Sequence, residues 1–303
     1  MKKIKVGIVG YGNLGSKIAK LIFNDERFCL VAIFSRRDIT SAYGSVEEYN
    51  NIEKYIGKID IMFLCGGSFS SLQDQAKRVL KNFNCIDAFD THKKIKQHLK
   101  NCDQIAKQNK KVAFCSFGWD PGLFSLMRLI FQSVEGSSFT SWGKGISQGH
   151  TEAIKQIKDV IDAVQYTVPN KNLIKKLKQG KSVNLNNLHR RICYVYAEKN
   201  YQKIKKKILN IPHYFKGQNV KVKFVEKAKL QTLKKSYHKG EVWTPFNTLN
   251  FSLTTDSNPT ITAKILIAFA LVLNEYIKEK KFGAYSILEI NFSKLDKYYK
   301  NCI

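Results

Sequence analysis

The chain has 303 residues and a formal net charge of +27, and 44% of its residues are hydrophobic and 12% aromatic. This composition excludes a disordered chain and provides enough apolar side chains for two domains with sizeable cores. The longest apolar run, at 265–273, is about half as long as a membrane span requires. Because a predicted strand follows the first three residues without a signal-peptide pattern, we expect a cytoplasmic protein with no membrane partner.

The positive charge raises the question of nucleic-acid binding. The lysines are spread over helix-like stretches such as 173–181 and 202–210, together with many Asn and Ile residues. No aromatic RNA-binding signature and no helix-turn-helix pattern accompanies them. We therefore expect solvated basic faces and no nucleic-acid partner, with a functional basic surface as the alternative.

Seven cysteines and six histidines are scattered along the sequence. They show no CxxC pair and no other spacing typical of metal ligands. Several cysteines lie in apolar, strand-like runs, which is typical of buried free thiols in a reducing compartment. We therefore expect free cysteines and no metal site.

The first 118 residues alternate between predicted strands and helices. Strands are expected at 3–10, 29–35, 59–65, 85–90 and 110–116, and helices at 14–25, near 45–52, around 71–83 and in a lysine-rich stretch before the last strand. This alternation indicates βαβ units, and hence an α/β fold with a doubly wound, Rossmann-type parallel sheet.

The pattern changes after the Gly- and Pro-rich turn 118–122. A predicted helix at 123–134 is followed by strands within 139–145, 163–169, 189–198, 220–226 and 248–255, which indicates a largely antiparallel α+β domain. A helix of about five turns begins at 258, and we expect it to pack back on the first domain. The predicted domains are thus 1–118, joined by the returning segment 259–303, and 119–258.

Gly10, Gly12 and Gly15 form a GxGxxG pattern between the first strand and the first helix. In such a turn the first glycine permits a tight bend, the second lets the backbone approach a pyrophosphate, and the third allows close helix–strand packing. The N–H groups and dipole at the start of the helix favour phosphate. We predict dinucleotide binding, the alternative being a glycine-rich turn without a ligand.

Ser35, Arg36 and Arg37 follow the second predicted strand. NAD-dependent enzymes commonly place an acidic residue here, about 20 residues beyond the glycine turn, to bind the ribose 2′-hydroxyl. A hydroxyl and two guanidinium groups suit a 2′-phosphate instead, because arginine matches both its charge and its oxygen geometry. The sequence therefore predicts NADP(H) as cofactor, unless the arginine pair is simply exposed.

Longer segments carry a more specific signal. They read FLCGGS at 63–68, DAFDTH at 87–92, SFGWDPGLFSLMR at 116–128, WGKGISQGH at 142–150, AVQYTVP at 163–169 and HRRICYV at 189–195. In this order and spacing the chain resembles the meso-diaminopimelate dehydrogenase family, and the resemblance extends from the first strand to DSNPTITAKILIAFA at 256–270.

The resemblance implies reversible, NADP-dependent oxidative deamination at the D-configured carbon of meso-2,6-diaminopimelate, with release of ammonia. The product, L-2-amino-6-oxopimelate, cyclises to tetrahydrodipicolinate, a precursor of lysine and of peptidoglycan. The resemblance also implies a homodimer, with an NADP-binding domain at 1–118 and a substrate-binding and dimerisation domain at 119–258.

Asp87 and Asp120 are the predicted catalytic residues. Asp87 ends a strand on the side of the sheet where ligands bind in doubly wound folds, and Asp120 lies in the Gly- and Pro-rich turn. Either carboxylate can hold an ammonium group or orient the reacting amine. A turn or cap role is the alternative for each.

The residues expected at the cofactor belong to the glycine turn, to the segments that follow predicted strands and to the turn 118–121. They are Gly10, Tyr11, Gly12, Asn13, Leu14, Gly15, Ser35, Arg36, Arg37, Cys65, Gly66, Gly67, Ser68, Asp87, Gly118, Trp119, Asp120 and Pro121.

The distal carboxylate of the substrate is expected to bind Arg191, Thr167 and His238. Arg191 can form a paired fork with a carboxylate, while its neighbour Arg190 faces the other side of the predicted strand. The alternatives are a core role for Trp142, an ordinary strand position for Thr167, and a turn or cap role for Asn258. By resemblance, the other substrate-binding residues are Asp87, Asp120, Trp142, Gln148, Gly149 and Asn258.

His238 departs most from the family pattern. Relatives usually read Pro-His-Gly-Gly here, whereas this chain reads YHKGEV at 237–242, and the loop that follows looks shorter. A surface histidine is the alternative, and substrate affinity or distal-end selectivity would then differ. We interpret His150, in the SQGH segment, as structural.

Two further functions stay open at this point. The altered segment around His238 favours a related NADP-dependent dehydrogenase that acts on another D-amino acid. A non-catalytic NADP sensor, or a basic nucleic-acid-binding protein, would show no reduction of NADP⁺ that depends on an amino acid.

Overall fold

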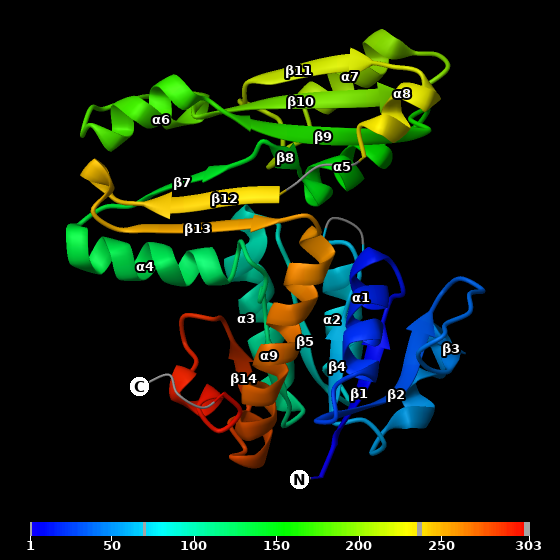
Figure 1. The fold of residues 1–303 in the computed structure, drawn as a ribbon. Coiled ribbons are helices and arrows are strands. Elements are labelled where there is room, and N and C mark those ends of the chain that lie inside the picture. Colours follow the sequence, from blue (N-terminus) through cyan, green and yellow to red (C-terminus); the bar gives the residue numbers. More distant parts are fainter. Residues whose placement is uncertain (1, 69–70, 235–237, 300–303) are drawn as a thin grey trace. The chain divides into compact units, whose positions relative to one another are not determined.

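The computed structural model describes residues 2–68, 71–234 and 238–299 (Figure 1). The chain divides into two compact units. Unit 1 comprises Met1–Ser125 and Pro259–Ile303, and unit 2 comprises Leu126–Asn258. Each unit is described by itself below.

Unit 1 is built on a seven-stranded sheet of order β14-β6-β5-β4-β1-β2-β3, in which every neighbouring pair is parallel. This confirms the predicted Rossmann-type sheet. The helix expected near 45–52 is wrong, because a short strand and the 3₁₀ helix η1 (Tyr49–Tyr55) occupy this segment. The strands are β1 (Ile4–Val9), β2 (Phe28–Ser35), β3 (Val46–Glu48), β4 (Ile61–Leu64), β5 (Asn84–Asp87), β6 (Val112–Phe114) and β14 (Gly283–Tyr285).

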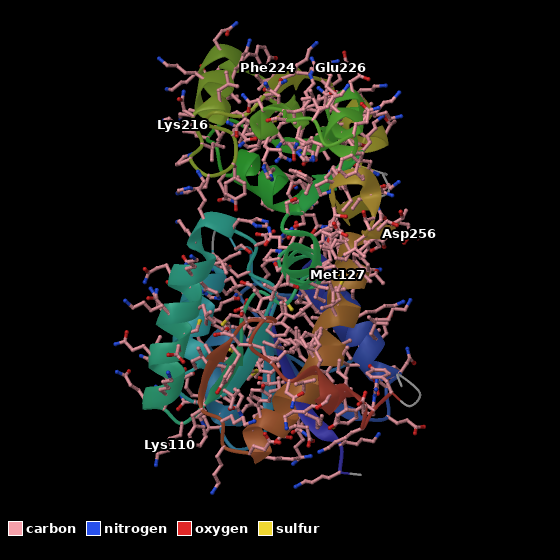
Figure 2. All side chains as sticks on the ribbon, turned by 90° about the vertical axis from the view of Figure 1, so that its left-hand side faces the viewer. Lys110, Met127, Lys216, Phe224, Glu226 and Asp256 are labelled. Atoms are coloured by element: carbon pink, nitrogen blue, oxygen red, sulfur yellow. The ribbon has the colours of Figure 1, made fainter. Side chains whose placement is uncertain are left out.

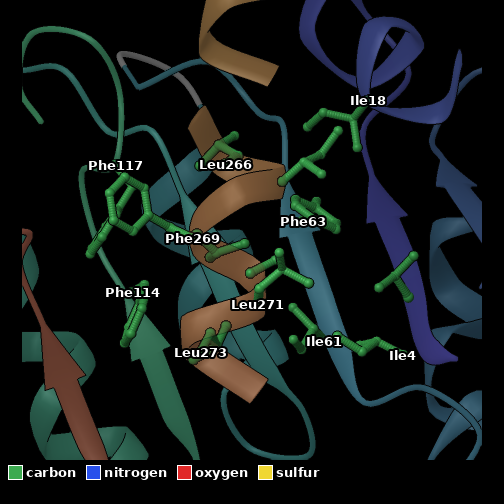
Figure 3. Packing of buried hydrophobic residues seen from close by; sticks show 14 of the residues in the cluster. Ile4, Ile18, Ile61, Phe63, Phe114, Phe117, Leu266, Phe269, Leu271 and Leu273 are labelled. Atoms are coloured by element: carbon green, nitrogen blue, oxygen red, sulfur yellow. The ribbon is translucent and has the colours of Figure 1, made fainter. Parts of the chain in front are cut away.

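Helices cover both faces of this sheet because successive strand residues point to opposite sides. In β4, Ile61 and Phe63 pack in one cluster with α1 (Asn13–Phe23) and α9 (Asn258–Lys278). Met62 and Leu64 pack in another with α2 (Leu72–Val79) and α3 (Ile95–Gln108). Figure 3 shows the first cluster, where side chains of α9 face the strands.

Helix α9 is the one helix among the described residues that is long and apolar enough to cross a membrane by length and composition alone. However, 67% of its most apolar window is buried inside the structure. Leu266, Phe269 and Leu273 lie in the core cluster that covers the parallel sheet (Figure 3). Burial of this kind is typical of a core helix, whose apolar surface contacts strands instead of lipid.

Unit 2 contains two sheets. One has the order β11-β10-β9-β8, where β10 pairs antiparallel with β9 and parallel with β11, and the other has the order β13-β12-β7 with antiparallel pairs. The α+β prediction is confirmed, but strand β12 was missed because Gly240 and charged residues interrupt its apolar pattern. The strands are β7 (Phe139–Trp142), β8 (Gly145–Ile146), β9 (Asp162–Pro169), β10 (His189–Tyr196), β11 (Val220–Phe224), β12 (His238–Trp243) and β13 (Asn250–Thr255).

The remaining helices of four or more residues in these units are α4 (Leu123–Glu135), α5 (Gln148–Lys155), α6 (Lys171–Lys178), α7 (Tyr201–Leu209), α8 (Lys227–Thr232) and η5 (Phe292–Leu295). Many lysines are exposed on these helices and in the turns between elements. Figure 2 labels Lys110 of unit 1 and Lys216 of unit 2, and both side chains are exposed. That these basic faces are solvated and bind no nucleic acid stays a prediction.

The cysteines are free among the described residues, but they are not uniformly buried. Cys85, Cys102, Cys115 and Cys193 are buried, and Cys65 is half-buried. Cys29 is exposed, so the expectation of burial is wrong there, since its side chain points outward at the start of β2. Cys302 lies outside the described residues.

Candidate active site

The turn between β1 and α1 has the geometry of a phosphate-binding loop. Gly10 adopts a φ of 95°, which side chains rarely permit. A Cβ on Gly15 would lie 2.0 Å from the carbonyl oxygen of Gly10, so only glycine allows the helix to approach this closely. The first turn of α1 carries no acidic side chain, and its cap residue Gly12 is exposed. The helical N–H groups at this end can therefore meet an anion.

Arg36 and Arg37 lie beside this turn because β2 pairs with β1. Ser35 ends β2, and its Oγ accepts a hydrogen bond from the Arg37 backbone N–H at 3.0 Å. One Arg37 guanidinium N–H donates to the carbonyl of Tyr11 at 3.2 Å, and both arginine side chains are exposed. Within the part of the chain that the structure describes, neither guanidinium pairs with a carboxylate. Their charge is available for a phosphate.

Cys65, Gly66, Gly67 and Ser68 follow β4 at the same edge of the sheet. The Cys65 N–H donates to the Val9 carbonyl at 2.8 Å, which joins this segment to the glycine turn. The carbonyl of Gly67 accepts hydrogen bonds from the N–H groups that begin α2. This arrangement leaves the backbone of Gly66 and Gly67 beside the predicted pyrophosphate position.

Asp87 is fully buried, and its side-chain hydrogen bonds with the described residues are made within unit 1. Its Oδ1 accepts from the N–H groups of Phe89 (2.9 Å) and Ser116 (2.8 Å). Its Oδ2 accepts from Nε2 of the buried His98 at 2.8 Å. This corrects the prediction that Asp87 contacts cofactor and substrate: the carboxylate instead holds two loops together, which is the turn role that the sequence left open.

Asp90 was not predicted, but it has the features expected of a ligand-binding acid. Its backbone N–H donates to Ser68 Oγ at 3.0 Å, while its side-chain Oδ1 is buried and has no hydrogen-bond partner among the described residues. Burial raises the pKa of Asp90, and the neighbouring Asp120 carboxylate adds to the increase. A cation between these groups would remove both penalties.

Asp120 lies in the turn after β6, where the chain folds back on itself. The Gly118 N–H donates to the Pro121 carbonyl at 2.9 Å, and the Leu123 N–H donates to the Gly118 carbonyl at 3.1 Å. The Phe117 N–H donates to the Asp87 carbonyl at 2.8 Å, so the turn is tied to the end of β5. Trp119 packs edge-on against Phe124. The predicted residues of this turn therefore stand beside Asp90.

In unit 2, Arg191 and Thr167 face each other on the paired strands β10 and β9. An Arg191 guanidinium N–H donates to Thr167 Oγ1 at 2.6 Å. Arg191 Nε is buried without a partner among the described residues, and burial lowers the pKa of the guanidinium to about 10. Arg190 points the other way and is exposed, as expected from strand geometry.

Gln165 was not predicted and extends this polar group. It is fully buried, and its Nε2 donates to Thr167 Oγ1 at 3.4 Å. Because that oxygen already accepts from Arg191, both lone pairs of Thr167 are used and its hydroxyl hydrogen is left to donate. The Thr167 hydroxyl and Arg191 Nε are thus both donors without a described acceptor, as a carboxylate site requires.

The remaining nominated residues of unit 2 lie around these strands. Trp142 ends β7, and its backbone N–H donates to Nε2 of the buried His189 at 3.0 Å. Burial lowers the pKa of His189 to about 3, with Arg191 adding to the effect, so this imidazole is neutral and accepts the bond. Gln148 and Gly149 begin α5, beside Gln165, whose carbonyl accepts from the Ser147 N–H at 2.9 Å.

His238 is the first residue of β12, the central strand of its sheet, and not part of a loop. The ring is buried, which lowers the pKa of His238 and excludes the surface role considered above. His150 packs edge-on against Tyr214 and Phe215 and contacts Ser147 Oγ at 2.8 Å, as expected for a structural residue. Asn258 begins α9 and is half-buried.

Comparison with known proteins decides the family. The model of the diaminopimelic acid dehydrogenase C-terminal domain matches residues 118–255. The meso-diaminopimelate D-dehydrogenase of Acetivibrio thermocellus is 37% identical over 96% of this chain and 93% of its own length. The chain belongs to the meso-diaminopimelate D-dehydrogenase family.

Solved structures of this family agree with the fold. DAP dehydrogenase of C. glutamicum in complex with DAP is 32% identical and superimposes with a TM-score of 0.88 over 97% of this chain and 96% of its own. An engineered D-amino acid dehydrogenase bound to NADP⁺ is 31% identical, with the same TM-score and coverage. The family resemblance inferred from the sequence is confirmed.

Proposed function

We propose that the protein is an NADP-dependent meso-diaminopimelate D-dehydrogenase. It oxidatively deaminates the D-configured carbon of meso-2,6-diaminopimelate: the substrate, NADP⁺ and water give L-2-amino-6-oxopimelate, ammonium, NADPH and a proton. The reaction is reversible, and its product cyclises to tetrahydrodipicolinate. Membership of an enzyme family of this name, over nearly the whole chain, supports the proposal.

The observation that carries the substrate class is the half-buried guanidinium of Arg191, whose Nε is buried without a partner among the described residues. A cation removed from water without a carboxylate beside it is unfavourable unless a ligand provides one. Among the described residues, the guanidinium has only the neutral Thr167 hydroxyl as a hydrogen-bond partner. A substrate carboxylate can accept from Arg191 Nε and from the Thr167 hydroxyl, which together define its orientation.

The residues of unit 1 fit NADP(H). The glycine turn and the start of α1 would hold the pyrophosphate, and Ser35, Arg36 and Arg37 the 2′-phosphate. Bound NADP⁺ supplies the hydride acceptor, which no side chain can replace. The chain's own task is to fix the substrate carbon and to exclude competing reactions.

Asp90 and Asp120 are the acids we propose for the reacting end, in place of Asp87. The buried Oδ1 of Asp90 can accept a hydrogen bond from the substrate ammonium. Because its pKa is raised, Asp90 can also take a proton from the amine or from the water that hydrolyses the imine. Asp120 would share the charge of the ammonium, while Asp87 positions both loops from behind.

The homodimer and the cytoplasmic location belong to this proposal as consequences of the resemblance. Light scattering of the purified protein measures the oligomeric state directly. A monomer at micromolar concentration would contradict the dimer without touching the proposed chemistry.

The decisive experiment follows NADPH formation by its near-ultraviolet absorbance, with NADP⁺ and each diaminopimelate stereoisomer in turn. We expect reduction with the meso isomer, equimolar release of ammonium, and little reaction with the LL isomer. NAD⁺ in parallel tests the Ser35–Arg37 pocket, and equal kcat/KM values for the two cofactors would contradict it. NADPH binding without reduction by any isomer would contradict the activity.

A second candidate is oxidation of another D-amino acid by the same chemistry. Similarity to an engineered D-amino acid dehydrogenase and the unusual segment around His238 favour this test. D-amino acids that lack the second carboxylate are assayed beside the meso isomer. A higher kcat/KM for one of them would replace the proposed substrate.

A further inference from the structure

Three side chains of metal-binding type meet on the face of the unit 1 sheet that α3 covers. His98 and Cys102 lie four residues apart on α3, so they share one side of the helix. Cys115 comes directly after β6. One ligand atom of each residue lies within 4.8 Å of the others, and all three residues are buried. The spacing of these residues along the chain does not indicate the cluster, because the fold of the sheet, not sequence spacing, brings Cys115 to the helix.

The distances match those of a metal centre. Cys102 Sγ lies 3.8 Å from His98 Nδ1. With Zn–S bonds of about 2.3 Å and Zn–N bonds of about 2.0–2.1 Å, tetrahedral coordination separates sulfur and nitrogen ligands by roughly 3.6 Å. The distance between Cys102 Sγ and His98 Nδ1 is therefore within a few tenths of an ångström of the separation expected for two ligands of one ion.

The orientation of His98 is that of a supported metal ligand. Nε2 faces Asp87 Oδ2 at 2.8 Å, and the ring stacks on Phe89 with centroids 4.3 Å apart. Because a carboxylate only accepts, Nε2 must donate, which leaves Nδ1 as the nitrogen that can coordinate. Cys102 Sγ lies at similar distances from both ring nitrogens, 3.8 Å from Nδ1 and 3.9 Å from Nε2. A carboxylate behind a ligating histidine is a common outer-sphere arrangement in zinc proteins.

A further buried thiol belongs to the same core but lies outside this group of three ligand atoms. Cys85 is fully buried on β5 and belongs to the same core cluster as Cys102 and Cys115. Cys85 pairs with Ala113 across β5 and β6, so Cys115, two residues further along, points to the same face. Two thiolates with one imidazole favour Zn²⁺ or another thiophilic ion over Mg²⁺ or Ca²⁺.

We propose that His98, Cys102 and Cys115 form a buried structural site for a thiophilic ion, with Zn²⁺ as the expected occupant. Each coordinating thiol releases its proton to water as it binds. The three side chains are buried, and the site takes no part in hydride transfer.

The location gives the ion a structural effect. Asp87 connects His98 to the N–H groups of Phe89 and Ser116, which begin the segments that carry Asp90 and Asp120. An ion that joins α3 to the end of β6 would therefore stiffen the base on which these two acids stand. Loss of the ion should therefore lower the melting temperature and leave KM nearly unchanged.

The first test is the metal content of the full chain. The protein is produced in medium supplemented with Zn²⁺, purified with reductant and without chelator, and analysed for zinc and copper by mass spectrometry. We expect one ion per chain. Changing Cys102 or Cys115 to Ala should lower the bound metal at least roughly tenfold, because loss of even an outer-sphere partner weakens metal binding by about that much. Cys193→Ala, a buried cysteine of unit 2, is the matched control and should keep the ion.

A spectroscopic measurement covers variants that fold poorly. The wild type is refolded with Cd²⁺, and thiolate-to-metal charge transfer is followed in the ultraviolet, with NADPH binding as the check on folding. A band in the wild type and in Cys193→Ala that is weakened in Cys102→Ala supports the site. If the wild type refolds with Cd²⁺ present but binds none and shows no band, the proposal is overturned. A band of equal strength in Cys102→Ala would overturn it too, and the three side chains would then be a cluster of core residues.

Discussion

The loops of unit 1 that carry Asp90 and Asp120 leave a buried polar atom without a hydrogen-bond partner among the described residues, and so does the β9–β10 strand pair of unit 2. The two atoms belong to side chains of opposite charge. In unit 1 the atom is Oδ1 of Asp90, and in unit 2 it is Nε of Arg191. Burial disfavours the charged form of both groups, because it raises the pKa of Asp90 and lowers that of Arg191. Neither group forms a salt bridge with another described residue, although the Ser68 hydroxyl and the nearby His92 offset part of the increase in the pKa of Asp90.

The difference in sign indicates what the missing partners are. Asp90 calls for a cation and Arg191 for an anion, and a diamino dicarboxylic acid carries both. The two regions also differ in rigidity. Asp90 stands on a loop held by Ser68 and Asp87, whereas Arg191 and Thr167 are fixed by a strand ladder. We therefore propose that recognition of the carboxylate is preorganised by secondary structure, and positioning of the amine by a network of loops.

The largest expected effect is the loss of turnover in Asp90→Asn. Removal of the proposed base and ammonium ligand should lower kcat about 10²–10⁴-fold, with NADPH affinity unchanged. Because burial raises the pKa of the Asp90 carboxyl in the folded protein, the charged carboxylate destabilises the fold at pH values above the usual Asp pKa. Asp90→Asn removes this charge and should therefore not lower the melting temperature at neutral pH. Steady-state kinetics and thermal unfolding measure both quantities.

Asp87→Asn is the matched contrast, three residues away. It leaves the buried His98 without its carboxylate, and breaking a buried pair costs about 3–5 kcal/mol of unfolding free energy. We therefore expect a lower melting temperature for Asp87→Asn and intact stability for Asp90→Asn. The reverse pattern, with Asp87 controlling kcat and Asp90 controlling stability, would restore the assignment made from the sequence.

The next effect is on the carboxylate. Arg191→Gln keeps a hydrogen-bond donor but removes the charge, and loss of a charge-assisted bond of about 2–3 kcal/mol should raise KM for meso-diaminopimelate roughly 30–150-fold. NADPH binding should stay unchanged. Arg190→Gln, on the exposed side of the same strand, is the control and should leave KM within about twofold. Equal effects of the two changes would argue for a general role of positive charge.

Much of this comparison could be predicted from the sequence. The parallel sheet, the glycine turn and the opposite orientations of Arg190 and Arg191 follow from patterns that are local or that a strand's period of two fixes. The pairing of Thr167 with Arg191 is a long-range contact that only the structure shows. Strand β12 was missed because its short, mixed pattern has no apolar alternation, and burial of His238 comes from its neighbours in the sheet.

The choice between Asp87 and Asp90 was beyond reach for a different reason. Both acids belong to the motif DAFD, and the first ends the strand at the expected edge. Which of them faces ligand depends on His98 and on the N–H group of Ser116, contacts across 11 and 29 residues. The signal that was available is that ligand-binding residues in such sheets often lie on the loop beyond the strand end. Gln165 was missed likewise, since only its contact with Thr167 gives it a role.

The smallest effect concerns a carboxylate of unit 1 whose partners are all present. Glu275, on α9, accepts hydrogen bonds from Lys278 (2.9 Å), Lys297 (2.6 Å) and the Tyr298 hydroxyl (2.9 Å). The bond from Lys297, supported by the other two, outweighs burial and lowers the pKa of Glu275 from 4.5 to about 2. Its shift is opposite to that of Asp90, as expected where cations are provided by the chain itself.

Because the folded pKa lies below the unfolded value, Glu275 stabilises the fold fully above pH 4.5, and this contribution is lost as the pH falls towards 2. The shift corresponds to at most about 3 kcal/mol, and to about 1–2 kcal/mol once solvent screening of the exposed lysines is considered. Urea unfolding of the wild type and of Glu275→Gln should therefore differ at pH 6 and converge near pH 2. A constant difference over this range would show that Glu275 contributes by packing instead of charge, and the contrast with Asp90 would then not rest on the presence of paired cations.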